Sequence, residues 1–127
     1  MMRSKLPRMV KMDVEDLTSQ RMEMIQMENP DLFTRYDLEE GDEGEWALIT
    51  VTDEHDRPVV FEIIESEDSW RRPDLVEKYN ELAAEASQVL VILPDDIYEE
   101  AVALLEKEAS RSIDLRSYGD IGLILRA

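Results

Sequence analysis

The chain has 127 residues, of which 43% are hydrophobic, and it carries a formal net charge of −17. This length and this apolar fraction suffice for one domain with its own core. The absence of cysteine excludes a disulfide framework, a thiolate metal site and a cysteine nucleophile, and it favours a reducing compartment. No apolar run approaches the roughly 20 residues of a membrane span, and the basic start lacks the apolar segment of a signal peptide. We therefore expect a cytoplasmic protein with no membrane partner.

The charges are unevenly distributed along the chain. The first eleven residues hold four bases and no acid, so the rest of the chain holds all 31 acids against ten bases. An acidic body repels the phosphates of nucleic acids, and we do not expect nucleic acid as a partner. Arginine outnumbers lysine by ten to four, which together with the acid excess is typical of an archaeal or halophilic composition. An acidic mesophilic or thermophilic protein fits these counts equally.

The start of the chain divides into a tail and a helix. Residues 1–12 are basic and contain Pro7, and we expect them to form a flexible tail ahead of a single α/β domain at 13–127. A helix is predicted to begin after Asp13, which can cap it, and to end at Asn29, which precedes a proline.

This helix is rich in methionine. All seven methionines of the protein lie within residues 1–27. Because methionine is flexible and polarizable, Met22, Met24 and Met27 are candidates for a surface that binds a protein partner or a second copy. Ordinary core packing is the alternative.

Three strands are expected next. They are an edge strand at 32–38, an inner strand at 46–52 that is apolar on both faces, and a strand at 59–65. The acidic, glycine-containing stretch 39–45 is predicted to be a solvated turn. Its carboxylates are potential ligands of Ca²⁺ or Mg²⁺, but the ligand spacing of an EF-hand is absent, which favours the turn.

The strand at 59–65 contains the one local conflict of the sequence. Alternation places Val60, Glu62 and Ile64 on one face, so a carboxylate stands in an apolar row. Such a carboxylate reaches water, finds a partner, stays protonated or binds a cation. Glu62 is therefore the main candidate for a functional site residue on this strand.

The loop that follows this strand, residues 66–72, contains Trp70, Arg71 and Arg72. One aromatic ring and two cations can bind an anion or clamp the acidic turn. The excess of carboxylates in the chain favours the clamp.

The second half of the domain has a regular pattern. A helix is predicted from Pro73 to Ala86, and a continuous apolar run at 88–93 predicts a buried parallel strand. A further helix follows, and two short strands are expected at 112–115 and 120–125. The order α-β-β-β-α-β-α-β-β implies an α/β fold with a central mixed sheet flanked by helices.

Asp95 or Asp96 is expected to cap the helix that follows the apolar run.

The order of elements, with PVVFEII at 58–64, LVEKY at 75–79 and VLVILPDD at 89–96, resembles the restriction-endonuclease-like, or PD-(D/E)XK, nuclease superfamily. In that family an early acid and an acid-x-lysine on the next strand gather Mg²⁺ and activate water, often with an acid on the first helix.

The resemblance implies site residues, and the sequence departs from the family motif. Glu62 matches the second acid, but the lysine position is Ile64, and only Glu45 stands near the place of the first acid. Related nucleases sometimes relocate the lysine to the following helix, where Lys78 lies. The resemblance thus gives Glu62 and Lys78 as candidates for catalysis, and Glu45, Glu62 and Glu15 as candidates for a metal site.

The degenerate motif favours a catalytically inactive protein of nuclease-like fold. We expect a small acidic binding or assembly module that contacts a protein partner or forms a homodimer, and we expect no cofactor. The alternative is a nuclease that depends on Mg²⁺ or Mn²⁺ and uses a migrated lysine.

Overall fold

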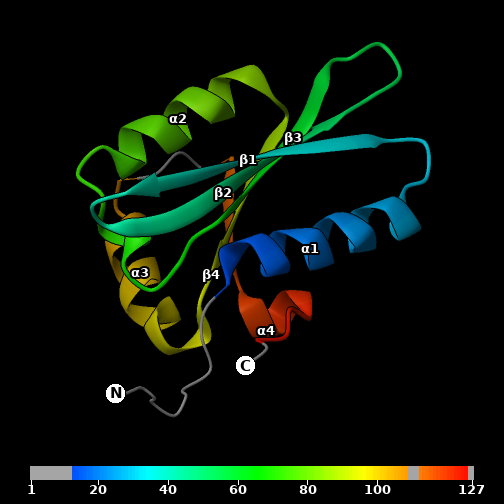
Figure 1. Ribbon diagram of the computed structural model, residues 1–127. Coiled ribbons are helices and arrows are strands. Elements are labelled where there is room, and N and C mark those ends of the chain that lie inside the picture. The colour runs from blue at the N-terminus through cyan, green and yellow to red at the C-terminus, as the bar shows by residue number, and fades with distance from the viewer. Residues whose placement is uncertain (1–12, 109–111, 126–127) are drawn as a thin grey trace.

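The computed structural model describes residues 13–108 and 112–125. Figure 1 shows one α/β domain in which a twisted sheet has helices on both faces. The tail predicted at 1–12 lies outside the described residues. Within the described ranges, no helix is long and apolar enough to cross a membrane.

The sheet has five strands in the order β1-β2-β3-β4-β5. The first three strands pair in antiparallel fashion, while β3, β4 and β5 run parallel to one another. The predicted mixed sheet is therefore confirmed. In chain order the helices and strands are α1 Val14–Glu28, β1 Phe33–Gly41, β2 Gly44–Thr52, β3 Pro58–Ile64, α2 Leu75–Glu85, β4 Gln88–Leu93, α3 Tyr98–Leu105, β5 Ile113–Ser117 and α4 Tyr118–Ile121, with short 3-10 helices η1 Ser69–Arg71 and η2 Asp95–Ile97.

Local signals determine the bounds of α1. The Asp13 side chain accepts a hydrogen bond from the backbone N–H of Asp16 at 3.2 Å, which caps the first turn. The helix ends at Asn29, before Pro30, as the sequence predicts. The buried side chains of α1, including Leu17 and Ile25, pack against the sheet.

The sheet separates two apolar cores. Helices α1 and α4 cover one face, and α2 and α3 cover the other (Figure 1). The first core lies between the sheet and helices α1 and α4, and the second lies between the sheet and helices α2 and α3. Because side chains alternate along β3, Val60 and Ile64 pack in the first core, whereas Phe61 and Ile63 pack in the second. We call these two sides the α1 face and the α2 face.

The β1–β2 hairpin is longer than predicted. Residues 39–41 and 44–45 belong to the strands, so only two residues of the expected loop make the turn. Gly44 has a φ of +108°, a backbone conformation that residues with a side chain rarely adopt, and a Cβ there would lie 3.2 Å from Ser66 Oγ. The turn therefore favours glycine at this position.

The C-terminal end corrects two predictions. The strand expected at 120–125 is wrong, because Ser117 caps the short helix α4 and Gly122, with φ of +94°, ends it. The observed order is therefore α-β-β-β-α-β-α-β-α. Neither expected aspartate caps α3, since that helix follows η2 without a side-chain cap. Asp95 instead accepts a hydrogen bond from the Gly119 N–H at 2.9 Å.

Candidate functional site

Glu62 lies in the middle of β3 on the α1 face, between Ile49 of β2 and Leu90 of β4. It is 5% exposed, and Arg21 of α1 donates to both carboxylate oxygens, with Nε–Oε1 at 2.6 Å and Nη2–Oε2 at 3.0 Å. Burial alone would lower the pKa of Arg21, but the hydrogen bond and charge of Glu62 outweigh it and raise that pKa. The conflict predicted for this strand is resolved by an ion pair with a residue that the sequence pattern did not name.

The ion pair changes the expectation for Glu62→Gln. On the sequence alone this substitution should be neutral or slightly stabilising, because it removes a costly charge. With Arg21 held in a bidentate pair, we expect the variant to lose about 1–3 kcal/mol of unfolding free energy, because a partly buried guanidinium loses its counter-charge. Urea unfolding measures the loss. Arg21→Met combined with Glu62→Leu replaces both charges and should recover most of it, whereas an unchanged urea midpoint for Glu62→Gln would contradict the prediction.

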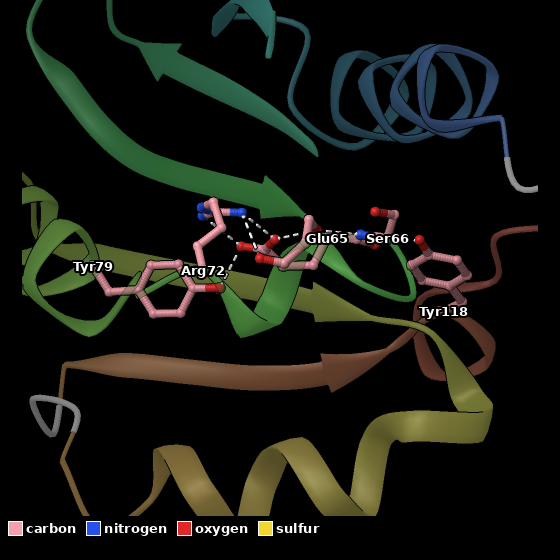
Figure 2. A network of polar contacts seen from close by, with 6 residues as sticks. Glu65, Ser66, Arg72, Tyr79 and Tyr118 are labelled. Carbon is pink, nitrogen blue, oxygen red and sulfur yellow. Dashed lines mark hydrogen bonds and ion pairs between the residues drawn. The ribbon is translucent and has the colours of Figure 1, made fainter. Parts of the chain in front are cut away.

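A second buried carboxylate, Glu65, follows β3 directly and is fully buried. Figure 2 shows it between Arg72, Tyr79 and Tyr118. Arg72 donates to its two oxygens from Nη1 at 2.7 Å and Nη2 at 3.1 Å, and Ser69 Oγ donates to Oε1 at 2.6 Å. The Tyr79 hydroxyl donates to Oε2, and the Tyr118 hydroxyl donates to the backbone carbonyl of Glu65. We call these five residues the Glu65 network.

The two tyrosines of the Glu65 network are held protonated. Burial raises the pKa of Tyr79 well above its ordinary value, and the negative charge of Glu65 raises it further. Burial also raises the pKa of Tyr118, with Glu65 again contributing. Because both hydroxyls remain donors, the network ties the end of β3 to η1, α2 and α4.

The arginines of the loop after β3 do not form the predicted clamp on the acidic turn at 39–45. Arg72 pairs with Glu65 instead, and Arg71 contacts Glu100 of α3 at 3.4 Å. The presence of Arg72 in this loop was the available signal for Glu65. The sequence pairs Arg72 with the acidic turn instead, because a glutamate at the end of a strand is ordinarily exposed.

Arg72 also lines a pocket of about 310 Å³ on the α2 face. Its guanidinium carbon lies 4.0 Å from the ring centroid of Trp46, so the charge is shared between Glu65 and an aromatic face. The other lining residues come from β1, β2 and the start of α2, and they are Asp37, Glu39, Leu48, Asp74 and Lys78. We call this the α2 pocket.

The nuclease-like candidates are not gathered at one point. Glu62 lies on the α1 face, whereas Lys78 lines the α2 pocket on the opposite face of the sheet. Glu45 stands four positions along β2 from the strand partner of Glu62, about 13 Å away. Glu15 of α1 accepts a hydrogen bond from the Tyr36 hydroxyl at 3.1 Å. Among the described residues, no three acidic, histidine or cysteine side chains are arranged to hold a metal ion.

The candidates for partner binding differ in exposure. Met22 and Met24 are partly buried against the first core, while Met27 is 79% exposed. Trp70 is 3% exposed and packs in the second core, so its ring is not at the surface. Arg71 is exposed and lies over the Trp70 ring, 4.9 Å from its centroid. Of these five side chains, Met27 and Arg71 are the ones available to a partner.

Strand β1 is an edge of the sheet, as predicted (Figure 1). No other strand of the described chain pairs with its outer side. Every second residue of an edge strand directs its N–H and C=O away from its neighbour, so these groups are open to a further strand. Phe33 and Tyr36 on this strand are 59% and 38% exposed.

Comparison with known proteins was negative. No protein-family model, curated protein or solved structure matches the chain. The chemistry of the site is therefore inferred from its own residues. Two facts stand out: both buried carboxylates, Glu62 and Glu65, are held by arginines of the same chain, and β1 presents its outer edge beside the α2 pocket.

Proposed function

We propose that this protein is a small acidic binding module that accepts an extended strand of a protein partner along the outer edge of β1. The observation that carries the proposal is the nine-residue edge strand β1, whose outer side pairs with no strand of the described chain. A strand added there would satisfy the outward N–H and C=O groups of β1 and extend the sheet.

Several of the protections that usually blunt an edge strand are missing from β1. Edge strands are commonly short, bulged or interrupted by proline or lysine, because a long regular edge invites unwanted pairing. β1 has nine residues against a usual strand length of about 5–6, and it contains neither proline nor lysine. Its charged side chains, those of Arg35, Asp37, Glu39 and Glu40, select against an uncharged or acidic partner strand rather than against every strand. Its pairing with β2 runs without a register shift from Phe33 to Gly41. These features support an edge that is used for binding.

The buried carboxylates support a role without catalysis. A catalytic or metal-binding carboxylate needs oxygens that face substrate or metal, but those of Glu62 are both bonded to Arg21, and those of Glu65 accept from Arg72 and from neighbouring hydroxyls. The nuclease alternative requires Glu62 to release Arg21 and to act together with Lys78 across the sheet. We propose the restriction-endonuclease-like architecture for this chain without the nuclease activity.

Strand addition can be tested on the full chain with three blocked hexapeptides, which alternate valine with lysine, threonine or glutamate. We expect at least one of them to slow hydrogen exchange of alternate β1 amides, because each outward N–H gains an acceptor. Amide exchange measured by NMR on ¹⁵N-labelled protein gives the readout. The proposal fails if no peptide protects β1.

N-methylation of the peptide separates strand pairing from looser contact. A peptide strand presents alternate N–H groups to its two sides, so methylating every second nitrogen blocks one edge and leaves the other intact. Of the two methylated isomers, one should keep the affinity of the parent peptide and the other should lose it. Equal binding of both isomers would show that no main-chain pairing occurs.

A further inference from the structure

We infer that the partner strand is basic on one face and apolar on the other, with lysine or arginine at alternate positions. This inference rests on the proposed strand addition at β1 and names the chemistry of the partner. It is carried by the charges that line the two ends of β1 and by the alternation of side chains along a strand.

Two carboxylates of β1 face the α2 pocket. Asp37 and Glu39 pair in register with Leu48 and Trp46 of β2, and all four line the pocket. Neither carboxylate has an ion-pair partner among the described residues. A strand added to β1 would place every second side chain on this face, with opposite Cβ atoms about 4.5–5.5 Å apart. Two partner residues separated by one position would therefore stand beside Asp37 and Glu39.

The other charged residues of the α2 pocket also favour a cationic side chain of the partner. Arg72 is already paired with Glu65, and the other charged lining residues are Asp74 and Lys78, both exposed. The uncommitted groups are thus three carboxylates against one ammonium. A cationic side chain gains from this balance, whereas an anionic one meets repulsion.

A second pocket of about 490 Å³ lies at the start of β1 and is acidic as well. It holds Phe33, which is 59% exposed and can cover the stem of a long cation. Phe33 and Glu39 are six positions apart on β1, or about 20 Å, so a partner segment of about seven residues spans both pockets. The other residues lining this second pocket are Pro30, Asp31, Leu32, Asp53 and Glu54.

The opposite face of β1 favours apolar partner side chains. Tyr36 and Leu38 point toward the α1 face, where the Tyr36 hydroxyl bonds Glu15 and Leu38 packs against the first core. A partner residue beside them extends this apolar contact. Arg35 lies on the α2 face between Phe33 and Asp37 and is paired with Asp56 at 3.5 Å, so a cation is not favoured beside it. Basic partner residues beside Asp37 and Glu39, alternating with apolar residues, therefore match the two faces of β1.

Charge argues against a second copy as the occupant. Each copy carries −17, and the β1–β2 hairpin at 33–52 contains six acids against one base, Arg35. Two such hairpins repel each other at the distances of approach. A basic segment of another protein is attracted instead.

Affinity for the three hexapeptides tests the inference on the full chain. We expect the lysine–valine peptide to bind about tenfold more tightly than the threonine–valine peptide, and the glutamate–valine peptide to bind most weakly. A peptide with the same composition but with its three lysines consecutive should bind more weakly than the alternating one. Titration calorimetry at low and high salt gives the dissociation constants, and the preference for lysine should shrink as salt rises.

A matched pair of variants assigns the preference to β1. Asp37→Asn combined with Glu39→Gln should lower the affinity for the lysine–valine peptide to about that for the threonine–valine peptide. Glu85→Gln combined with Glu99→Gln removes the same charge from exposed positions outside the pocket and should change the affinity by less than about twofold.

The possible outcomes are distinguishable. Equal binding of the lysine and threonine peptides, or equal losses in both double variants, overturns the inference while strand addition stands. Equal binding of the scrambled peptide also overturns it, because charge alone then suffices. If no peptide protects β1, the proposed function itself fails. If the chain sediments as a dimer with β1 amides already protected, the occupant is a second copy and the inference is wrong.

Discussion

Replacing Glu65 with glutamine is expected to lower the free energy of unfolding by about 3–5 kcal/mol, the usual cost of breaking a buried ion pair. Four donor contacts, from Arg72, Ser69 and Tyr79, converge on its two carboxylate oxygens. The amide of glutamine offers one acceptor oxygen, and its NH₂ group, itself a donor, would face a donor of the network. The variant would also leave the Arg72 side chain, which is 11% exposed, without its counter-charge.

Urea unfolding followed by circular dichroism measures this loss. Glu100→Gln is the matched control, because it removes the partner of the neighbouring Arg71 in a pair whose side chains are 58% and 64% exposed. That variant should lose less than about 1 kcal/mol. A cycle with Arg72→Gln should show a strong coupling between Glu65 and Arg72. If Glu65→Gln loses no more than the control, the Glu65 network does not stabilise the fold.

The elements that the sequence predicts correctly are those determined by neighbouring residues. Helix α1 begins at a side-chain cap and ends before a proline, and both signals lie within a few positions of the helix ends. The continuous apolar run at 88–93 is β4, because a strand buried on both faces needs no polar positions. The strand predicted at 120–125 is wrong, because the side-chain cap at Ser117 and the positive φ of Gly122 favour the short helix α4 over the alternating pattern of those residues.

The site was predicted less completely, because its partners are distant in sequence. Glu62 was found from alternation alone, but its partner Arg21 is 41 positions away. Two partners of Glu65, Ser69 and Arg72, are only four and seven positions away, but the sequence prediction assigns the loop arginines to the acidic turn. The contacts with Tyr79 and Tyr118 are 14 and 53 positions away and have no local signal. The edge position of β1 was predicted, whereas the α2 pocket beside it requires β1, β2 and α2 to be assembled.

Alkaline pH should destabilise the protein through Tyr79 and Tyr118. Burial raises the pKa of both hydroxyls in the folded state, whereas an unfolded chain ionises tyrosine near pH 10. Above that pH the unfolded state therefore binds fewer protons than the folded state, so the free energy of unfolding falls as pH rises. Below about pH 10 the contribution is fully present.

Each tyrosine that stays protonated in the folded state adds a slope of about 1.4 kcal/mol per pH unit above its unfolded pKa. Urea unfolding between about pH 9 and 11 measures the slope. The pKa values of Tyr36 and Tyr98 are raised as well, but Tyr79 and Tyr118 are the deeply buried pair. Tyr79→Phe and Tyr118→Phe should each remove a large part of the slope, and each also loses a hydrogen bond at neutral pH. The hydrogen bond to Glu15 raises the pKa of Tyr36 too, but its ring is exposed, so Tyr36→Phe should reduce the slope less than either buried variant does. An unchanged slope in both buried variants would mean that these hydroxyls ionise in the folded protein as freely as in the unfolded chain.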